Sequence, residues 1–286
     1  MDRQSNGVAL TIGASVIWGT SFVATSVGLE YTNPYVLLFE RFFVASVAIL
    51  ALGIFTRSAR VWSELRRTHI WGVSVVYAAA FLLQFLGQSE SSASASALLS
   101  NLFIIFVPVA AFFLLRERMP TSSKAAVGLS VVGIVLVLPS GFQFTGATLG
   151  DVLLLGAAAG YTLFIVLGKM YGVSSLASSF ALIVSMTVVT APLAAIEGGP
   201  FALGTVFTAA AWESVTWLAI PCTVVALAMY TRGLASIRAT QSSTLLLLEI
   251  IVGVALSVSL LGNVFSLTQA FGVGVIALAI LLSSRR

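Results

Sequence analysis

Residues 91–138 read SSASASALLSNLFIIFVPVAAFFLLRERMPTSSKAAVGLSVVGIVLVL, two long apolar runs joined by a short basic segment. Residues 237–284 repeat this pattern without a gap, at an offset of 146 positions. Identical pairs at this offset include Ala93 with Ala239, Ser96 with Ser242, Leu102 with Leu248, and Gly128 with Gly274. A fixed offset of this kind indicates an internal repeat. Because apolar sequences also match by chance, two unrelated apolar hairpins are the alternative.

The composition is that of a membrane protein. Hydrophobic residues make up 59% of the 286 residues and charged residues only 8%, against about 25% charged residues in a soluble domain. A membrane-spanning helix needs about 20 apolar residues, and such runs occur along the whole sequence. We therefore predict an all-α integral membrane protein embedded in the lipid bilayer.

The residue types that enzymes and metal sites need are scarce. One cysteine, Cys222, and one histidine, His69, exclude an intramolecular disulfide and the usual zinc sites. The sequence holds no GxSxG nucleophile motif, no aspartate-rich motif for a diphosphate and no Walker A motif for ATP. We predict that the chain is not an enzyme and uses no metal and no cofactor. A channel is disfavoured, because nothing resembles a filter loop or a ring of charges.

Turn-forming residues divide the apolar sequence into ten predicted helices. Asn33-Pro34 and Met119-Pro120 are two such breaks, because proline lacks an N–H and cannot continue a helix. The predicted helices cover residues 7–29, 34–55, 70–88, 93–115, 124–138, 149–168, 176–196, 212–234, 239–261 and 266–283.

The placement of charges supports this count. With a cytoplasmic N-terminus, every lysine and arginine except Arg41 falls on the cytoplasmic side, as the positive-inside rule requires. The opposite side carries Glu30, Glu90, Asp151, Glu197 and Glu213. One helix more or fewer would reverse all later loops, so we predict ten crossings with both termini cytoplasmic. The basic residues thus mark topology, and we expect no nucleic-acid partner.

Ten helices and an offset of 146 give two repeats of five helices, residues 1–146 and residues 147–286. Because five is an odd number, the second repeat enters the membrane from the opposite side, and the two halves are inverted. Two similar halves of opposite orientation have two nearly equivalent arrangements, each open to one face of the membrane. This architecture is typical of transporters that work by alternating access.

Several short motifs are spread along the chain, and the pattern returns more weakly in the second half. They are Trp18, Gly19 and Phe22; Pro34, Arg41 and Phe42; Pro108, Arg116 and Glu117; Gly128 and Gly133; and, more weakly, Leu248, Glu249 and Gly274. With these motifs the chain resembles the drug/metabolite transporter superfamily, EamA type, and most of all its YddG-like amino-acid exporters. The resemblance implies ten helices in two inverted repeats and the export of small metabolites. The chain departs from it at Ile250, where many members have proline, and at Asn263, which stands where the first half has Glu117.

Glu249 is the most conspicuous polar candidate, about ten residues into the ninth predicted helix. A carboxylate at this depth is costly unless it faces a cavity or a partner. It could bind a substrate ammonium or a proton. The alternative is a neutral acid that is hydrogen-bonded to a neighbouring helix.

Glu40 and Arg41 are adjacent in the second predicted helix, about 10 Å from its outer end at 1.5 Å per residue. Adjacent helical residues point in different directions. We favour a structural or gate ion pair for these two residues over substrate binding. Snorkelling of Arg41 to the outer surface is the alternative.

Aromatic and amide side chains share one face of the third predicted helix, at Tyr77, Phe81, Gln84 and Gln88. Gln84 matches Tyr230 at the offset of 146, and Trp18 matches Tyr161 at about 143. We predict a central cavity for a small amphipathic solute, lined by Trp18, Tyr77, Gln84, Tyr161, Tyr230 and Glu249. The alternative is that these aromatic residues only pack helices together.

We therefore expect a secondary transporter, monomeric and located in a bacterial inner membrane. It would export amino acids, including aromatic and other apolar ones, and related small metabolites. Either a proton coupled through Glu249 or Glu40, or the gradient of the solute itself, would drive it. The alternatives are carriers of a nucleobase, a polyamine, a drug cation or a nucleotide-sugar. The last is disfavoured, because several phosphates need more than one buried arginine.

Overall fold

The fold is an all-helical bundle that crosses the membrane ten times. The computed structural model describes residues 3–55, 59–90, 98–137, 148–173, 176–198, 209–261 and 266–284. Within these ranges, eight helices are long and apolar enough to span a bilayer, and two shorter apolar helices cover Leu98–Leu114 and Thr121–Val137. The predicted all-α membrane protein with ten crossings is confirmed.

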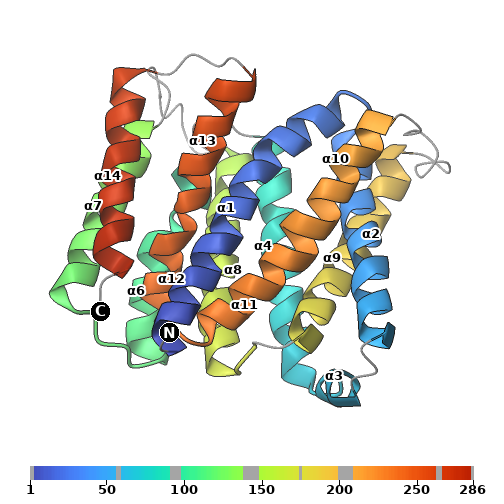
Figure 1. The fold of residues 1–286 in the computed structure, drawn as a ribbon, viewed down its shortest axis with the longest axis horizontal. Helices are drawn as coiled ribbons and strands as arrows, with labels where there is room; N and C mark the ends of the chain where they lie inside the picture. Colours follow the sequence, from blue (N-terminus) through green and yellow to red (C-terminus); the bar gives the residue numbers. More distant parts are fainter. Residues whose placement is uncertain are drawn as a thin grey trace.

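The described helices follow one another as α1 (Arg3–Leu29), α2 (Pro34–Phe55), α3 (Ala59–Glu64), α4 (Thr68–Ser89), α6 (Phe103–Leu114), α7 (Thr121–Val137), α8 (Leu149–Met170), α9 (Leu176–Gly198), α10 (Ala209–Ala219), the π-helix η2 (Ile220–Val225), α11 (Ala226–Leu234), α12 (Ala239–Leu246), α13 (Leu248–Leu261) and α14 (Leu267–Ser284). Both chain ends and the short α3 lie at the same edge of the bundle, as ten crossings require (Figure 1). The sequence did not predict α3.

Local sequence chemistry starts the membrane helices. At α2, the Asn33 side-chain oxygen accepts the N–H of Tyr35 at 2.8 Å and of Val36 at 3.1 Å, and Pro34 at the first helical position needs no partner for an N–H. At α8, the side chains of Thr148 and Asp151 each accept the other's backbone N–H in a capping box. These caps satisfy backbone donors that the hydrocarbon could not.

Three predicted helices are not continuous. The predicted helix 212–234 contains the π-helix η2 around Pro221, because proline cannot donate the normal i to i−4 hydrogen bond and widens the turn. The predicted helix 239–261 is divided at Leu247 into α12 and α13. The predicted helix 93–115 is interrupted before α6 by a turn at Asn101 and Leu102; its first residues, 93–97, lie outside the described residues.

The helix contacts follow the repeat. At the repeat offset, α4 corresponds to α10 and α11, α8 to α1, and α6 to α13. The extensive contact of α4 with α8 has its counterpart in that of α1 with α10 and α11, and the contact of α6 with α8 has its counterpart in that of α1 with α13. The repeat offset relates α2 to α9 and α7 to α14, and the two helices of each pair contact each other. These two pairs therefore lie on the pseudo-two-fold axis that relates inverted halves.

Glycine pairs bring the helix backbones of each half together. A Cβ atom added at Gly150 of α8 would lie 2.8 Å from the carbonyl oxygen of Gly87 in α4, and one added at Gly233 of α11 would lie 2.9 Å from that of Gly7 in α1. Gly87 matches Gly233 at the offset of 146, whereas Gly150 matches Gly7 at 143. The first helix of each half thus follows the offset of 143. The predicted boundary between residues 1–146 and 147–286 lies outside the described residues.

Candidate functional site

A cavity of about 460 Å³ lies between the two halves. Its walls come from α1, α2, α4, α8, α10, α11, α12, α13 and the segment 98–103. Side chains of both halves therefore face a single space, as the predicted central cavity requires. The volume falls in the range of about 300 to 1,000 Å³ that is common for small-molecule sites.

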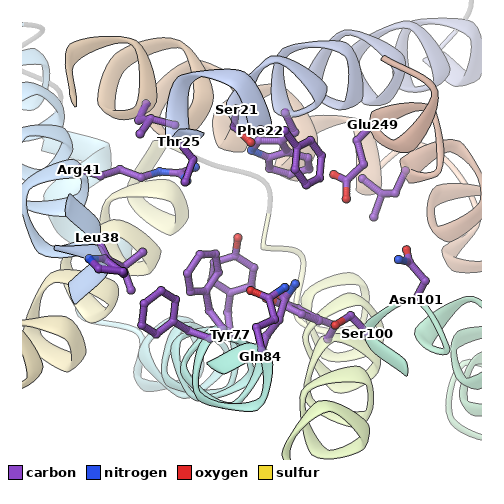
Figure 2. A pocket seen from close by; sticks show the side chains of 18 of the residues that line it. Ser21, Phe22, Thr25, Leu38, Arg41, Tyr77, Gln84, Ser100, Asn101 and Glu249 are labelled. Atoms are coloured by element: carbon purple, nitrogen blue, oxygen red, sulfur yellow. The ribbon is translucent and has the colours of Figure 1, made fainter. Parts of the chain in front are cut away.

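The structure brings the predicted cavity residues together. The cavity lining includes all six of them and Arg41: Trp18, Tyr77, Gln84, Tyr161, Tyr230 and Glu249. Figure 2 shows Arg41 and Glu249 on opposite sides of the pocket, with Tyr77 and Gln84 on the wall between them. Glu40 is not among the lining residues.

Aromatic rings form one continuous wall of the cavity. The Tyr77 ring lies 4.6 Å from that of Phe164 and 5.9 Å from that of Tyr161, centroid to centroid. The Phe164 ring lies 6.2 Å from that of Tyr230, which lies 5.3 Å from that of Trp18. Tilted and edge-on rings at these distances attract one another. The wall is therefore preorganised and presents π-faces to a bound solute.

The four residues that the repeat relates in sequence form two contacts in space, each between one residue of either half. Trp18 packs on Tyr230. At the equivalent place in the other half, the Tyr161 hydroxyl donates a hydrogen bond of 2.5 Å to the Gln84 side-chain oxygen. The offsets of 143 and 146 exchange these two contacts. The two halves thus place related contacts on both sides of the cavity, one between two rings and one between a ring and an amide.

Glu249 lies where a helix is interrupted. It is the second residue of α13, directly after the break at Leu247. The tight bonds Leu247 N–H to Thr244 C=O and Ile250 N–H to Leu247 C=O, at 3.2 and 3.1 Å, carry the chain across the break. A helix N-terminus favours negative charge, and no described residue forms a hydrogen bond or an ion pair with the Glu249 carboxylate. The carboxylate is therefore available to a ligand in the cavity.

Arg41 reaches from α2 to the π-helix. Its Nε donates to the Thr223 hydroxyl at 2.9 Å, and its Nη2 lies 3.5 Å from the Cys222 carbonyl oxygen. That carbonyl also accepts the Trp18 indole N–H at 2.8 Å. The guanidinium carbon lies 5.4 Å from the centre of the Phe42 ring. All these partners are uncharged.

Glu40 turns away from Arg41, as adjacent positions on a helix predict. Its side chain is 6% exposed, and its Oε2 atom is buried with no hydrogen-bond partner in the described part of the chain. The hydrogen bonds of Arg41 go to the π-helix instead. An ion pair between the two residues is not formed in this arrangement.

The cavity reaches only one face of the bundle. Leu29, Pro34 and Gln88 line it, and these residues lie at the helix ends that charge placement predicts to be external. At the opposite face, Lys169 donates to the carbonyls of Leu234 and Ile237. This arrangement is therefore open to the outside.

A second contact closes the cytoplasmic face beside Lys169. The Glu117 side chain accepts the N–H of Ala239, the first residue of α12, at 3.0 Å. Both contacts join the loop after α11 to another helix or loop. We call Lys169, Glu117 and the three residues that they bind the inner seal.

Sequence reasoning missed the residues around the two breaks. Ser100, Phe103 and Leu246 line the cavity together with Glu249. At the offset of 146, Ser100 corresponds to Leu246 and Phe103 corresponds to Glu249. The repeat itself was the available signal, because a cavity lined by Glu249 implies that its counterpart Phe103 also lines the cavity.

Nothing in the described residues suggests a metal centre, since no group of three or more His, Cys, Asp or Glu side chains in these ranges could hold an ion. The two inverted helical halves and the polar and aromatic cavity between them define a multi-pass membrane transporter. The EamA-like transporter family matches residues 5–138 and, separately, residues 148–285. The chain belongs to this family. Membership also confirms that the chain is a transporter rather than an enzyme.

Known relatives support the same class. The chain is 30% identical over 247 residues to an uncharacterized transporter of Archaeoglobus fulgidus. The matched region covers 82% of this chain and 81% of the relative. It is 21% identical to YyaM, an uncharacterized transporter of Bacillus subtilis, over 99% of this chain and 94% of the relative. A protein of known crystal structure shares the fold with a TM-score of 0.79 at 17% identity, over 98% of this chain and 96% of that chain.

Proposed function

We propose that the chain exports amino acids, including aromatic and other apolar ones, and related small metabolites, as its resemblance to YddG-like exporters implies. The observation that carries this proposal is a single cavity with a continuous aromatic wall and, beside it, an unpaired carboxylate at Glu249. Aromatic faces bind apolar side chains and also attract ammonium groups. Amino acids combine these two features in one small molecule.

Alternating access is the transport mechanism that we infer. The repeats, residues 1–146 and 147–286, would rock against each other around the cavity. The inner seal would open as the external entrance closes. Glu249 would meet the solute or carry a proton, and the solute's own gradient is sufficient if it carries none.

The charge inventory of the cavity argues against phosphorylated solutes. Arg41 is the only arginine or lysine among its lining residues in the described ranges. Sites for several phosphates use clusters of such groups. A nucleotide-sugar is therefore a poor candidate, whereas a nucleobase, a polyamine or a drug cation remains the second candidate class because Glu249 can accept a cation.

The setting that we propose is the inner membrane of a bacterium, with the transporter acting as a monomer. Support comes from the positive charges that gather on one side of the predicted topology. The cavity lies between the two halves of the chain, so one copy brings both repeats to the site.

Counterflow in proteoliposomes tests the proposed function. Vesicles loaded with unlabelled phenylalanine, methionine or threonine should accumulate the labelled amino acid above protein-free liposomes. Replacing Tyr77 by alanine removes a ring that contacts both Tyr161 and Phe164 and should reduce uptake about 2- to 10-fold, since aromatic stacking contributes about 0.5–1.5 kcal/mol beyond its buried area. Phe113→Ala, at a side chain 73% exposed on α6 and outside the cavity lining, is the matched control.

Two results decide the proposal. Counterflow that Tyr77→Ala reduces and Phe113→Ala preserves would support an amino-acid carrier that uses this cavity. Exchange of a nucleobase, a polyamine or a nucleotide-sugar, without any amino acid, would contradict the substrate class.

A further inference from the structure

Arg41 is a cation without a charged partner. Its hydrogen bonds and ring contact in the described structure go to Thr223, Cys222 and Phe42, none of them acidic. A guanidinium has five N–H donors in a planar fork, and two of its nitrogens account for every hydrogen bond given above. Its Nη1 donates to no described residue. A charge at membrane depth is costly unless it is paired or faces a polar cavity, and Arg41 meets this condition by lining the cavity.

The geometry directs the unused donors toward the cavity. The π-helix holds the Nε side of the fork, because the Thr223 hydroxyl accepts from Nε and donates onward to the Leu218 carbonyl at 2.7 Å. Thr223 is 4% exposed, so water does not compete for this bond. Figure 2 shows the side chain of Arg41 entering the pocket beside Thr25. Thr25 also lines the cavity and has no hydrogen bond to a described residue.

We propose that Arg41 and Thr25 form a carboxylate subsite, held in position by Thr223, and that the transported solute must carry a carboxylate. Guanidinium binds carboxylate through two parallel N–H···O bonds, a match of shape that a point charge cannot provide. This inference rests on the proposed function of an amino-acid carrier and specifies which end of the solute is recognised. It replaces the predicted ion pair of Arg41 with Glu40.

The position of Glu249 sharpens the proposal. The carboxylate and the ammonium of an α-amino acid are attached to the same carbon, whereas Arg41 and Glu249 lie on opposite sides of the pocket (Figure 2). We therefore assign the carboxylate of the solute to Arg41, and this assignment does not require an ion pair between its ammonium and Glu249. Recognition then depends on the carboxylate and on the side chain along Tyr77 and its neighbours. Glu249 is left for a proton or for a polar group on the far end of the solute.

Three phenyl compounds separate the two charged groups. L-Phenylalanine carries both groups, 3-phenylpropionate carries only the carboxylate, and 2-phenylethylamine carries only the ammonium. Purified full-length protein is melted in the presence of each, because a ligand that binds the folded state raises the melting temperature. Phenylalanine and phenylpropionate should stabilise the wild-type protein, and phenylethylamine should not. Phenylalaninamide, which lacks the charged carboxylate, should behave like phenylethylamine.

Variants then locate the effect. Arg41→Gln should weaken the binding of phenylalanine and of phenylpropionate about 10- to 100-fold, the equivalent of one lost hydrogen bond to a charged group. Arg41→Lys keeps the charge without the fork and should retain only part of the binding. Thr223→Val should weaken carboxylate binding through Arg41, and Thr223→Ser should restore it. Thr187→Val, which removes the 2.8 Å bond from Ser46 to Thr187 outside the cavity, is the control and should leave binding unchanged.

The outcomes distinguish this inference from the proposed function. Stabilisation by phenylethylamine or phenylalaninamide equal to that by phenylpropionate would overturn the carboxylate subsite without any variant. Unchanged carboxylate binding in a folded Arg41→Gln protein would overturn it as well, even if amino-acid counterflow persists. Stabilisation by phenylpropionate without counterflow of any amino acid would instead support the subsite and contradict the amino-acid exporter.

Discussion

At the scale of single residues, the sequence predicted which side chains meet but not how they are held. The offsets placed Trp18 with Tyr161 and Gln84 with Tyr230, and the structure brings these side chains into one cavity as two exchanged contacts. The partners of Arg41 could not be predicted. They depend on the π-helix around Pro221, and a proline in a membrane helix does not specify how the freed backbone is rearranged.

Glu249→Gln tests whether this residue carries a proton. The change keeps the size of the side chain and removes its ionisation. If Glu249 exchanges a proton during transport, counterflow of the wild-type protein should change with pH, and counterflow of the variant should not. The measurement is the initial rate of counterflow from acidic to alkaline pH. An equal pH dependence in both proteins would show that transport is driven without this carboxylate.

At the scale of helices, the apolar runs of the sequence predicted which helices exist and in what order. They did not predict where a helix is interrupted. The ten apolar segments were found because most are about as long as the membrane is thick and turn-forming residues separate them. The breaks at Asn101 and at Leu247 were not found, since neither residue is a proline or glycine and long apolar runs continue after both. The relation of the breaks by the repeat shows that tertiary packing, rather than local propensity, places them.

The glycine contact of α4 with α8 yields a stability prediction. A Cβ at Gly150 would lie 2.6 Å from the backbone carbonyl carbon of Glu90, where no side chain can move aside. Gly150→Ala should therefore lower the free energy of unfolding by about 1–3 kcal/mol, the usual effect of overpacking. Thermal unfolding of the purified protein measures it.

Gly128 provides the matched control, because a Cβ there meets nothing within 4 Å. Gly128→Ala lies in α7 and should cause no loss, since alanine is the better helix former by about 1 kcal/mol. A Gly150→Ala protein that melts at the same temperature as Gly128→Ala would show that the backbones are not in contact.

At the scale of the whole molecule, the topology could be predicted from charge alone, whereas the conformational state could not. The sequence places lysines and arginines on one side, but two inverted halves allow an outward-open and an inward-open arrangement with the same topology. The structure shows the former, because Lys169 and Glu117 close the cytoplasmic face. These bonds join segments about 65 to 122 positions apart, beyond the reach of any local pattern.

Weakening the inner seal should shift the equilibrium from the outward-open toward the inward-open state. Lys169→Met removes the donor to the Leu234 and Ile237 carbonyls and keeps an unbranched side chain. In a Cys222→Ala background, Leu246→Cys places a thiol in the cavity. Labelling of that thiol by an external, membrane-impermeant reagent should slow about 10-fold or more in Lys169→Met, as the loss of the two hydrogen bonds from a charged donor predicts.

Arg66→Met is the control for the inner seal. This arginine is exposed on the same face, and none of the hydrogen bonds described above involves its side chain. Its replacement should leave the labelling rate unchanged. Equal rates in Lys169→Met and Arg66→Met would mean that the contacts of Lys169 do not determine the state.

The glycine pairs also identify where the balance between the two states originates. A molecule with two identical inverted halves would have two states of equal energy, because a two-fold rotation would convert one state into the other with the same contacts. At the offset of 143 that the glycine pairs define, Lys169 corresponds to Ser26, whose hydroxyl binds only the Phe22 carbonyl of its own helix. The cytoplasmic closure thus has a cross-helix bond from a charged donor, whereas the equivalent position of the other half holds a neutral hydroxyl. This divergence between the duplicated halves makes the two closures chemically different, and such a difference is what allows one state to be favoured over the other.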